Sequence, residues 1–250
     1  MIPLATPNMT GCERAVISRA LREGWVGPDG KDVRQFEEMV RIAAGRQWAV
    51  ATVTGSAALE AAAFALGFIE QKIEVPRLAF PAMFNVLARL GNRLVLVEGG
   101  ANHDFALYKG KDWPTIADRA PAIGEPPTTA TLECYSFAAN KTITTGQGGA
   151  VVGDDRCLER LVRQIIRQGY KPSGAYNMRM ANINAALGCA QMTKLTEFRA
   201  AKRRIWDHYK AAGLPMIERG ASRWMATADI DLDGAELGFE YRVEPSGGTS

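Results

Sequence analysis

The chain has 250 residues, 47% of them hydrophobic and 23% charged, as in an ordinary globular protein with a sizeable core. Its net charge of +3 is too small to indicate a nucleic-acid surface, and no apolar run is long enough to span a membrane. Four cysteines without a C-x-x-C pair, beside only two histidines, argue against a zinc or other metal site and for reduced thiols, so we expect a soluble cytoplasmic protein.

The N-terminal half alternates between helical and strand patterns. Two amphipathic helices are predicted to end near Glu23 and Gly45, with a loop rich in turn residues between them. A strand, an Ala-rich helix, a short strand, a helix and a strand then follow at 48–53, 56–66, 73–75, 81–90 and 93–97. This alternation is typical of an α/β fold with a mostly parallel central sheet and flanking helices.

The C-terminal half is less regular. Between 98 and 129 we expect at most one short strand, at 115–117. Two strands and two helices are then predicted at 131–135, 149–152, 154–168 and 182–212. The remaining segment holds one or two strands, too few for a core of their own. We therefore expect a large domain at 1–195 and a reduced C-terminal α+β domain at 196–250.

Lys141 lies in a turn of small residues between two predicted strands, at the end of the stretch 136–141 (Ser-Phe-Ala-Ala-Asn-Lys). Few neighbours there can solvate an ammonium group. The turn therefore favours a lowered pKa and a nucleophilic amine that can form a Schiff base with a carbonyl. The alternative is an ordinary lysine in a β-turn.

Thr54, Gly55 and Ser56 stand where a predicted strand gives way to a helix. Free backbone N–H groups and the positive end of the helix dipole meet at such a turn, which makes it an anion site, and Ser56 can add a hydroxyl donor. The alternative is that Ser56 is a plain N-cap.

Asp118 follows an apolar pair at the end of a short predicted strand. A carboxylate buried at a strand end is costly unless it has a cationic partner, and a protonated ring nitrogen would be one such partner. The alternatives are an aspartate that simply begins a loop, or a salt bridge to the neighbouring Arg119.

These three motifs, taken in order, resemble the DegT/DnrJ/EryC1/StrS family of sugar aminotransferases, which depend on pyridoxal 5'-phosphate (PLP) and have the type I fold of aspartate aminotransferase. The resemblance includes S-F-x-x-N-K-x-I-T-T-G-x-G-G around Lys141, the strand and loop that lead to Phe80, and the segment 177–180 (Asn-Met-Arg-Met). It covers roughly residues 1–205, with every motif in the order typical of the family.

The resemblance implies a role for each matching residue. Lys141 would form the Schiff base with PLP and carry the proton of the substrate, and Asp118 would pair with the pyridine nitrogen. Phe80 would stack on one face of the ring. The residues implied to bind the phosphate are Gly55, Ser56 and Ser136.

Asn177 would reach the phosphate of a neighbouring subunit's cofactor, so the resemblance implies a homodimer with shared active sites. The implied reaction moves an amino group from a donor such as glutamate to a keto group of a nucleotide-linked sugar. A histidine at the position of Lys141 marks relatives that dehydrate instead, so the lysine favours transamination.

Three departures from the family pattern affect the segments expected to shape the pocket for the acceptor substrate. The connection at 98–118 is short, Pro121 stands where a histidine or glutamine is usual, and the C-terminal domain is cut down. Two alternatives therefore stay open: a PLP enzyme of another reaction type (decarboxylation, elimination or transfer) on a modified nucleotide or base, and a non-catalytic dimeric binding module.

Overall fold

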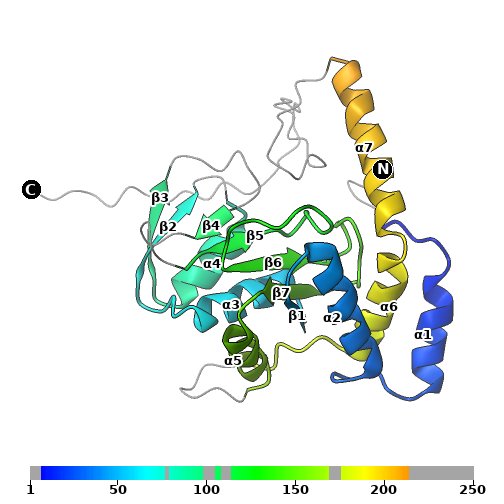
Figure 1. The fold of residues 1–250 in the computed structure, drawn as a ribbon, viewed down its shortest axis with the longest axis horizontal. Helices are drawn as coiled ribbons and strands as arrows, with labels where there is room; N and C mark the ends of the chain where they lie inside the picture. Colours follow the sequence, from blue (N-terminus) through cyan, green and yellow to red (C-terminus); the bar gives the residue numbers. More distant parts are fainter. Residues whose placement is uncertain (1–6, 77–78, 98–104, 108–113, 169–175, 214–250) are drawn as a thin grey trace, which may run out of the picture.

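The structure is a computed structural model that describes residues 7–76, 79–97, 105–107, 114–168 and 176–213 (Figure 1). Its helices are α1 (Glu13–Arg22), α2 (Lys31–Ala44), α3 (Gly55–Ala65), α4 (Pro81–Arg89), α5 (Arg156–Ile166), α6 (Asn182–Met192) and α7 (Leu195–Ala211). Its strands are β1 (Trp48–Thr52), β2 (Lys72–Pro76), β3 (Arg93–Val97), β4 (Phe105–Leu107), β5 (Ile116–Asp118), β6 (Leu132–Ser136) and β7 (Gly149–Gly153).

Five strands form the main sheet in the order β1-β7-β6-β5-β4. β5 and β6 are parallel, whereas β7 runs antiparallel to both of its neighbours, β1 and β6. β1, β5 and β6 therefore share one direction, and their carboxyl ends meet at one edge of the sheet. In α/β sheets this edge is where ligands bind.

The α/β class is confirmed, but the sheet is mixed rather than mostly parallel. The segment 137–148 joins β6 to β7 without a crossover helix, so the chain turns back and β7 runs against β6. β4 was not expected, and it pairs antiparallel with β5 at the sheet edge. β2 and β3, which flank α4, form a separate parallel pair.

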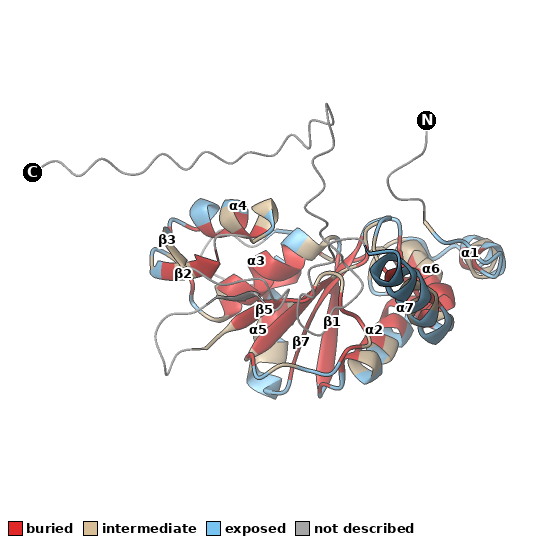
Figure 2. Ribbon diagram, turned by 90° about the horizontal axis from the view of Figure 1, so that it is seen from above, coloured by how far each residue is buried: buried red, intermediate tan, exposed pale blue. Residues whose placement is uncertain are grey.

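Helices cover both faces of the main sheet (Figure 2). Ala-rich α3 packs on β6 and β7 and contacts α4 and α5, which makes one hydrophobic core. The second core lies on the other face, where α2 and α6 pack together and Phe36 meets Phe137 edge-on at 5.0 Å. The strands between the two cores are consequently buried on both sides, and all five residues of β1 and of β7 are buried.

The helix predicted at 182–212 is two helices, because the chain turns at Thr193 and Lys194 between α6 and α7. The strands expected after residue 213 lie outside the described residues, so the division at 195/196 stays a prediction. In the part of the chain that the structure describes, no helix has the length and apolar character needed to cross a bilayer. All four cysteines are free thiols, and Cys12 and Cys157 are exposed.

Candidate active site

A cavity of about 480 Å³ opens where the carboxyl ends of β5 and β6 face the N-termini of α3 and α4. Six of the seven residues expected at the site line it: Gly55, Ser56, Phe80, Asp118, Ser136 and Lys141. Segments up to 86 residues apart in the chain thus converge on one cavity.

The N-terminus of α3 forms one end of the cavity. Thr54 is the N-cap, and its Oγ1 accepts a hydrogen bond of 3.0 Å from the N–H of Ala57. The alternative that Ser56 is the N-cap is therefore wrong. Ser56 is exposed in the first turn, where its N–H and that of Gly55 have no intrahelical acceptor. These donors suit an anion.

Asp118 is the last residue of β5 and is 6% exposed. Its Oδ1 accepts a hydrogen bond of 3.0 Å from the N–H of Ala120. Burial raises the pKa of this carboxyl group, while the Ala120 N–H and the charge of Lys141 act to lower it. The structure gives Asp118 no ion pair among the described residues, and Arg119 instead donates to the carbonyl of Pro126 at 2.9 Å. The buried carboxylate therefore suits a cationic ligand.

Lys141 is half-buried in a narrow loop between β6 and β7. The loop is closed by backbone hydrogen bonds from Phe137 N to Gly148 O (2.8 Å) and from Lys141 N to Ala138 O (3.0 Å). Burial lowers the pKa of the Lys141 amine, and the Asp118 carboxylate opposes that effect. The lowered pKa increases the fraction of neutral, nucleophilic amine at a given pH.

Phe80 caps the N-terminus of α4 and is 64% exposed. Its ring centroid lies 5.9 Å from Lys141 Nζ, so the ring and the amine face the same space. An exposed aromatic ring at the mouth of a cavity can cover a flat ligand.

Lys202 lies near the site but was not among the site residues predicted from the sequence. It extends from α7, and its Nζ donates a hydrogen bond of 3.2 Å to Oγ1 of Thr142, the residue after Lys141. Burial lowers the pKa of Lys202, and the charge of Lys141 lowers it further. Lys202 belongs to a run of three cations that is typical of a solvated helix face, so no sequence signal distinguished it.

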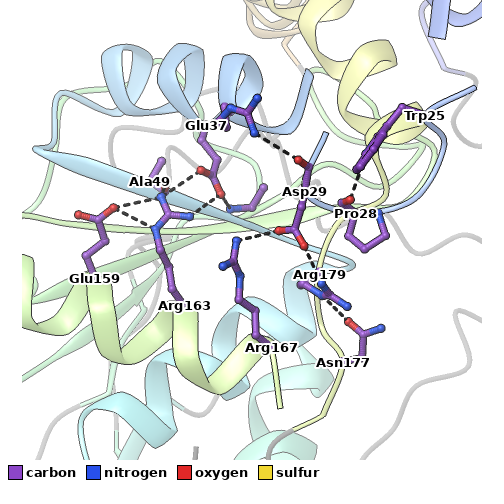
Figure 3. Close-up of polar contacts among 12 residues, drawn as sticks. Trp25, Pro28, Asp29, Glu37, Ala49, Glu159, Arg163, Arg167, Asn177 and Arg179 are labelled. Carbon is purple, nitrogen blue, oxygen red and sulfur yellow. Dashed lines mark hydrogen bonds and ion pairs between the residues drawn. The ribbon is translucent and has the colours of Figure 1, made fainter. Parts of the chain in front are cut away.

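Asn177 lies outside the cavity and is exposed. Its Oδ1 accepts a hydrogen bond of 3.0 Å from Arg179 Nε, close to Asp29 (Figure 3). Its expected role in a neighbouring subunit's site stays a prediction.

Comparison with known proteins points to one family. The model of the DegT/DnrJ/EryC1/StrS aminotransferase family matches residues 7–104 and 111–220. The GDP-perosamine synthase of Vibrio cholerae is 30% identical over 86% of this chain and 72% of that protein. The GDP-perosamine synthase of Escherichia coli O157:H7 is 29% identical over 84% of this chain and 70% of that protein.

Solved structures have the same fold. DesI, crystallised with its TDP-sugar product, superposes with a TM-score of 0.75 at 24% identity, over 86% of this chain and 67% of that one. A Streptococcus pneumoniae protein in its PLP-form superposes with a TM-score of 0.77 at 20% identity, over 90% of this chain and 77% of that one. The type I fold is confirmed, and the chain belongs to the DegT/DnrJ/EryC1/StrS family of PLP-dependent aminotransferases.

Proposed function

We propose that this chain moves an amino group from glutamate to a keto group of a GDP-linked sugar, as a homodimer in which each active site takes residues from both chains. One observation carries the proposal: a single cavity joins a half-buried amine and an open helix N-terminus to a buried carboxylate that has no ion pair among the described residues. The names of the V. cholerae and E. coli relatives support an amino sugar carried by GDP.

The cavity residues fit PLP, which combines a dianionic phosphate, a basic ring nitrogen and an aldehyde. The open N–H groups of α3 suit the phosphate, since such groups bind anions at helix N-termini. Asp118 is buried and lacks an ion pair among the described residues, so it suits a protonated ring nitrogen. When bound, PLP supplies an electron sink that permits transfer of the amino group.

Lys141 acts at the reacting carbon in this proposal. Because its pKa is lowered by burial, its Nζ holds a lone pair with which to bond the cofactor. Once the amino donor has displaced it, the freed amine would take the proton from the α-carbon of that donor and return it to the carbon that carried the cofactor's aldehyde group. Asp118 keeps the ring nitrogen protonated throughout.

Ser136 and Phe80 hold the cofactor in place. Ser136 ends β6 beside Gly55, so its hydroxyl can add a donor to the phosphate end. Phe80 covers a ring face and excludes water from it. Asn177 of each chain donates from its amide to the phosphate bound by the other chain, which makes the dimer the smallest complete unit.

The acceptor is tested by incubating the purified protein and PLP with glutamate and a GDP-linked keto sugar. We expect a GDP-linked amino sugar and 2-oxoglutarate in equal amounts, and neither from the Lys141→Ala variant. Release of 2-oxoglutarate with no amino sugar from this acceptor, but with one from the dTDP-linked analogue, would refute the GDP assignment. Glutamate that stays unchanged would refute the proposed donor.

A further inference from the structure

The carboxylate of Asp29 binds two arginines, Arg167 and Arg179, that lie far from it in the sequence (Figure 3). Its Oδ1 accepts from Arg167 Nη2 at 2.7 Å, just after α5, and its Oδ2 accepts from Arg179 Nη1 at 2.6 Å. Its backbone has a φ of 67°, in the left-handed region that aspartate and asparagine tolerate better than most residues. Arg34 Nη1 donates to its carbonyl at 3.2 Å and helps to hold this conformation.

Arg179 uses a second edge of its guanidinium on Asn177. While Nη1 binds Asp29, Nε donates to Asn177 Oδ1 at 3.0 Å. A guanidinium group can only donate, so the amide atom that faces it must be the oxygen. The NH₂ group of Asn177 then points away from Arg179, and the structure gives it no acceptor among the described residues. The exposed side of Asn177 therefore carries the two N–H donors of its amide. A phosphate dianion can only accept hydrogen bonds, so it suits these donors.

The backbone around Asn177 is held by other contacts. Met178 N donates to Ile166 O at 3.0 Å, and Val53 N donates to Met178 O at 2.8 Å. The side chain of Asp29 is 42% exposed, so its ion pairs contribute little to folding. Loss of the Asp29 carboxylate should therefore change the orientation of Arg179 and Asn177 but leave the fold in place.

We propose that Asp29 is a positioning residue for the neighbouring subunit's active site: it holds Arg179, which fixes the amide of Asn177 with its donors directed outward. The inference rests on the proposed function, in which Asn177 binds the other chain's PLP. It adds that the loop before α2 controls cofactor binding in the partner and not in its own chain.

The first test is the affinity for PLP, measured by titrating the visible absorption of PLP bound to Lys141. Asp29→Asn keeps the shape and the left-handed backbone but removes the charge, and we expect the dissociation constant to rise about tenfold, as for a lost charge-assisted hydrogen bond. Glu38→Gln, which breaks a pair with Arg41 on the surface of α2, is the matched control and should bind PLP like the wild type. Melting temperatures of both variants should match the wild type.

The second test uses mixed dimers of Asp29→Asn and Lys141→Ala chains, separated by two affinity tags. Only the Asp29→Asn chain can form the absorbing bond, and its PLP would meet Asn177 from the Lys141→Ala chain, whose Asp29 is intact. We therefore expect wild-type affinity in the mixed dimer, although the Asp29→Asn homodimer binds weakly.

Each contrary result has a separate meaning. Weak binding in the mixed dimer would show that Asp29 acts within its own chain, and wild-type affinity in the Asp29→Asn homodimer would show that it has no role; either result overturns the inference. A wild-type monomer that binds PLP at full affinity also overturns it. A wild-type protein that binds no PLP would refute the proposed function itself.

Discussion

The backbone at Gly55 approaches Ser136 so closely that a Cβ atom added to Gly55 would lie 2.8 Å from Ser136 Cβ. Gly55 begins α3 and Ser136 ends β6, so this contact fixes the distance between the helix N-terminus and the sheet edge. Both residues line the cavity at the end assigned to the phosphate. The contact therefore sets the geometry of the proposed phosphate site.

Gly55→Ala should weaken PLP binding by about ten- to a hundredfold, because an inserted methyl group at such a contact costs about 1–3 kcal/mol and displaces Ser136 or α3. Ser56→Ala, which removes one hydroxyl and adds no bulk, is the comparison and should lose less affinity. Titration of bound PLP measures both. Equal affinity in Gly55→Ala and the wild type would contradict the phosphate assignment.

Asp118→Asn should stabilise the protein without PLP and weaken its binding of PLP. Burial raises the pKa of Asp118 above the ordinary 3.8, so the stability of the unliganded protein falls as pH rises from 3.8 through the raised pKa. The amide has no charge to bury, and we expect a gain of about 1 kcal/mol at pH 7. Urea unfolding across this pH range measures the gain; a less stable Asp118→Asn protein would contradict it.

The rate at which PLP bonds to Lys141 should rise with pH and level off below the ordinary lysine value of 10.5, because burial lowers the pKa of this amine. Asp118→Asn removes the carboxylate that opposes this effect, which should favour the neutral form of Lys141 and shift the midpoint to lower pH. Glu38→Gln, which loses only an exposed pair with Arg41, serves as the control. Stopped-flow absorbance gives the profiles. An unshifted midpoint in Asp118→Asn would exclude this coupling.

Phe80→Ala should weaken PLP binding and leave the melting temperature unchanged, because the ring is 64% exposed and packs little in the folded chain. Phe80→Tyr keeps an aromatic face and should bind like the wild type. Calorimetric melting and PLP titration separate the two effects. If Phe80→Ala binds PLP as tightly as Phe80→Tyr, the ring does not cover the cofactor.

Local patterns predicted the parts of the site that depend on short stretches of chain. Gly55 and Asp118 lie where a strand gives way to the next element, and Lys141 lies in a turn between two strands; such features are visible in sequence. The antiparallel direction of β7 was not predicted. A mostly parallel sheet requires a helix between consecutive strands, and the segment between β6 and β7 has none. The contacts of Lys202 and Asp29 join residues 60 and 150 positions apart, which no local pattern encodes. Arg163 and Arg167 likewise bind residues far away in the chain, Glu37 and Asp29.

In the proposed reaction Lys141 bonds PLP and carries out the amino transfer. Glutamate added to the PLP-loaded protein without an acceptor isolates this step, and the 2-oxoglutarate released is then measured. We predict one 2-oxoglutarate per active site, with loss of the visible absorption of PLP bound to Lys141, and no release from Lys141→Ala. Release from Lys141→Ala at the wild-type rate, or none from the PLP-loaded wild type, would contradict the claim.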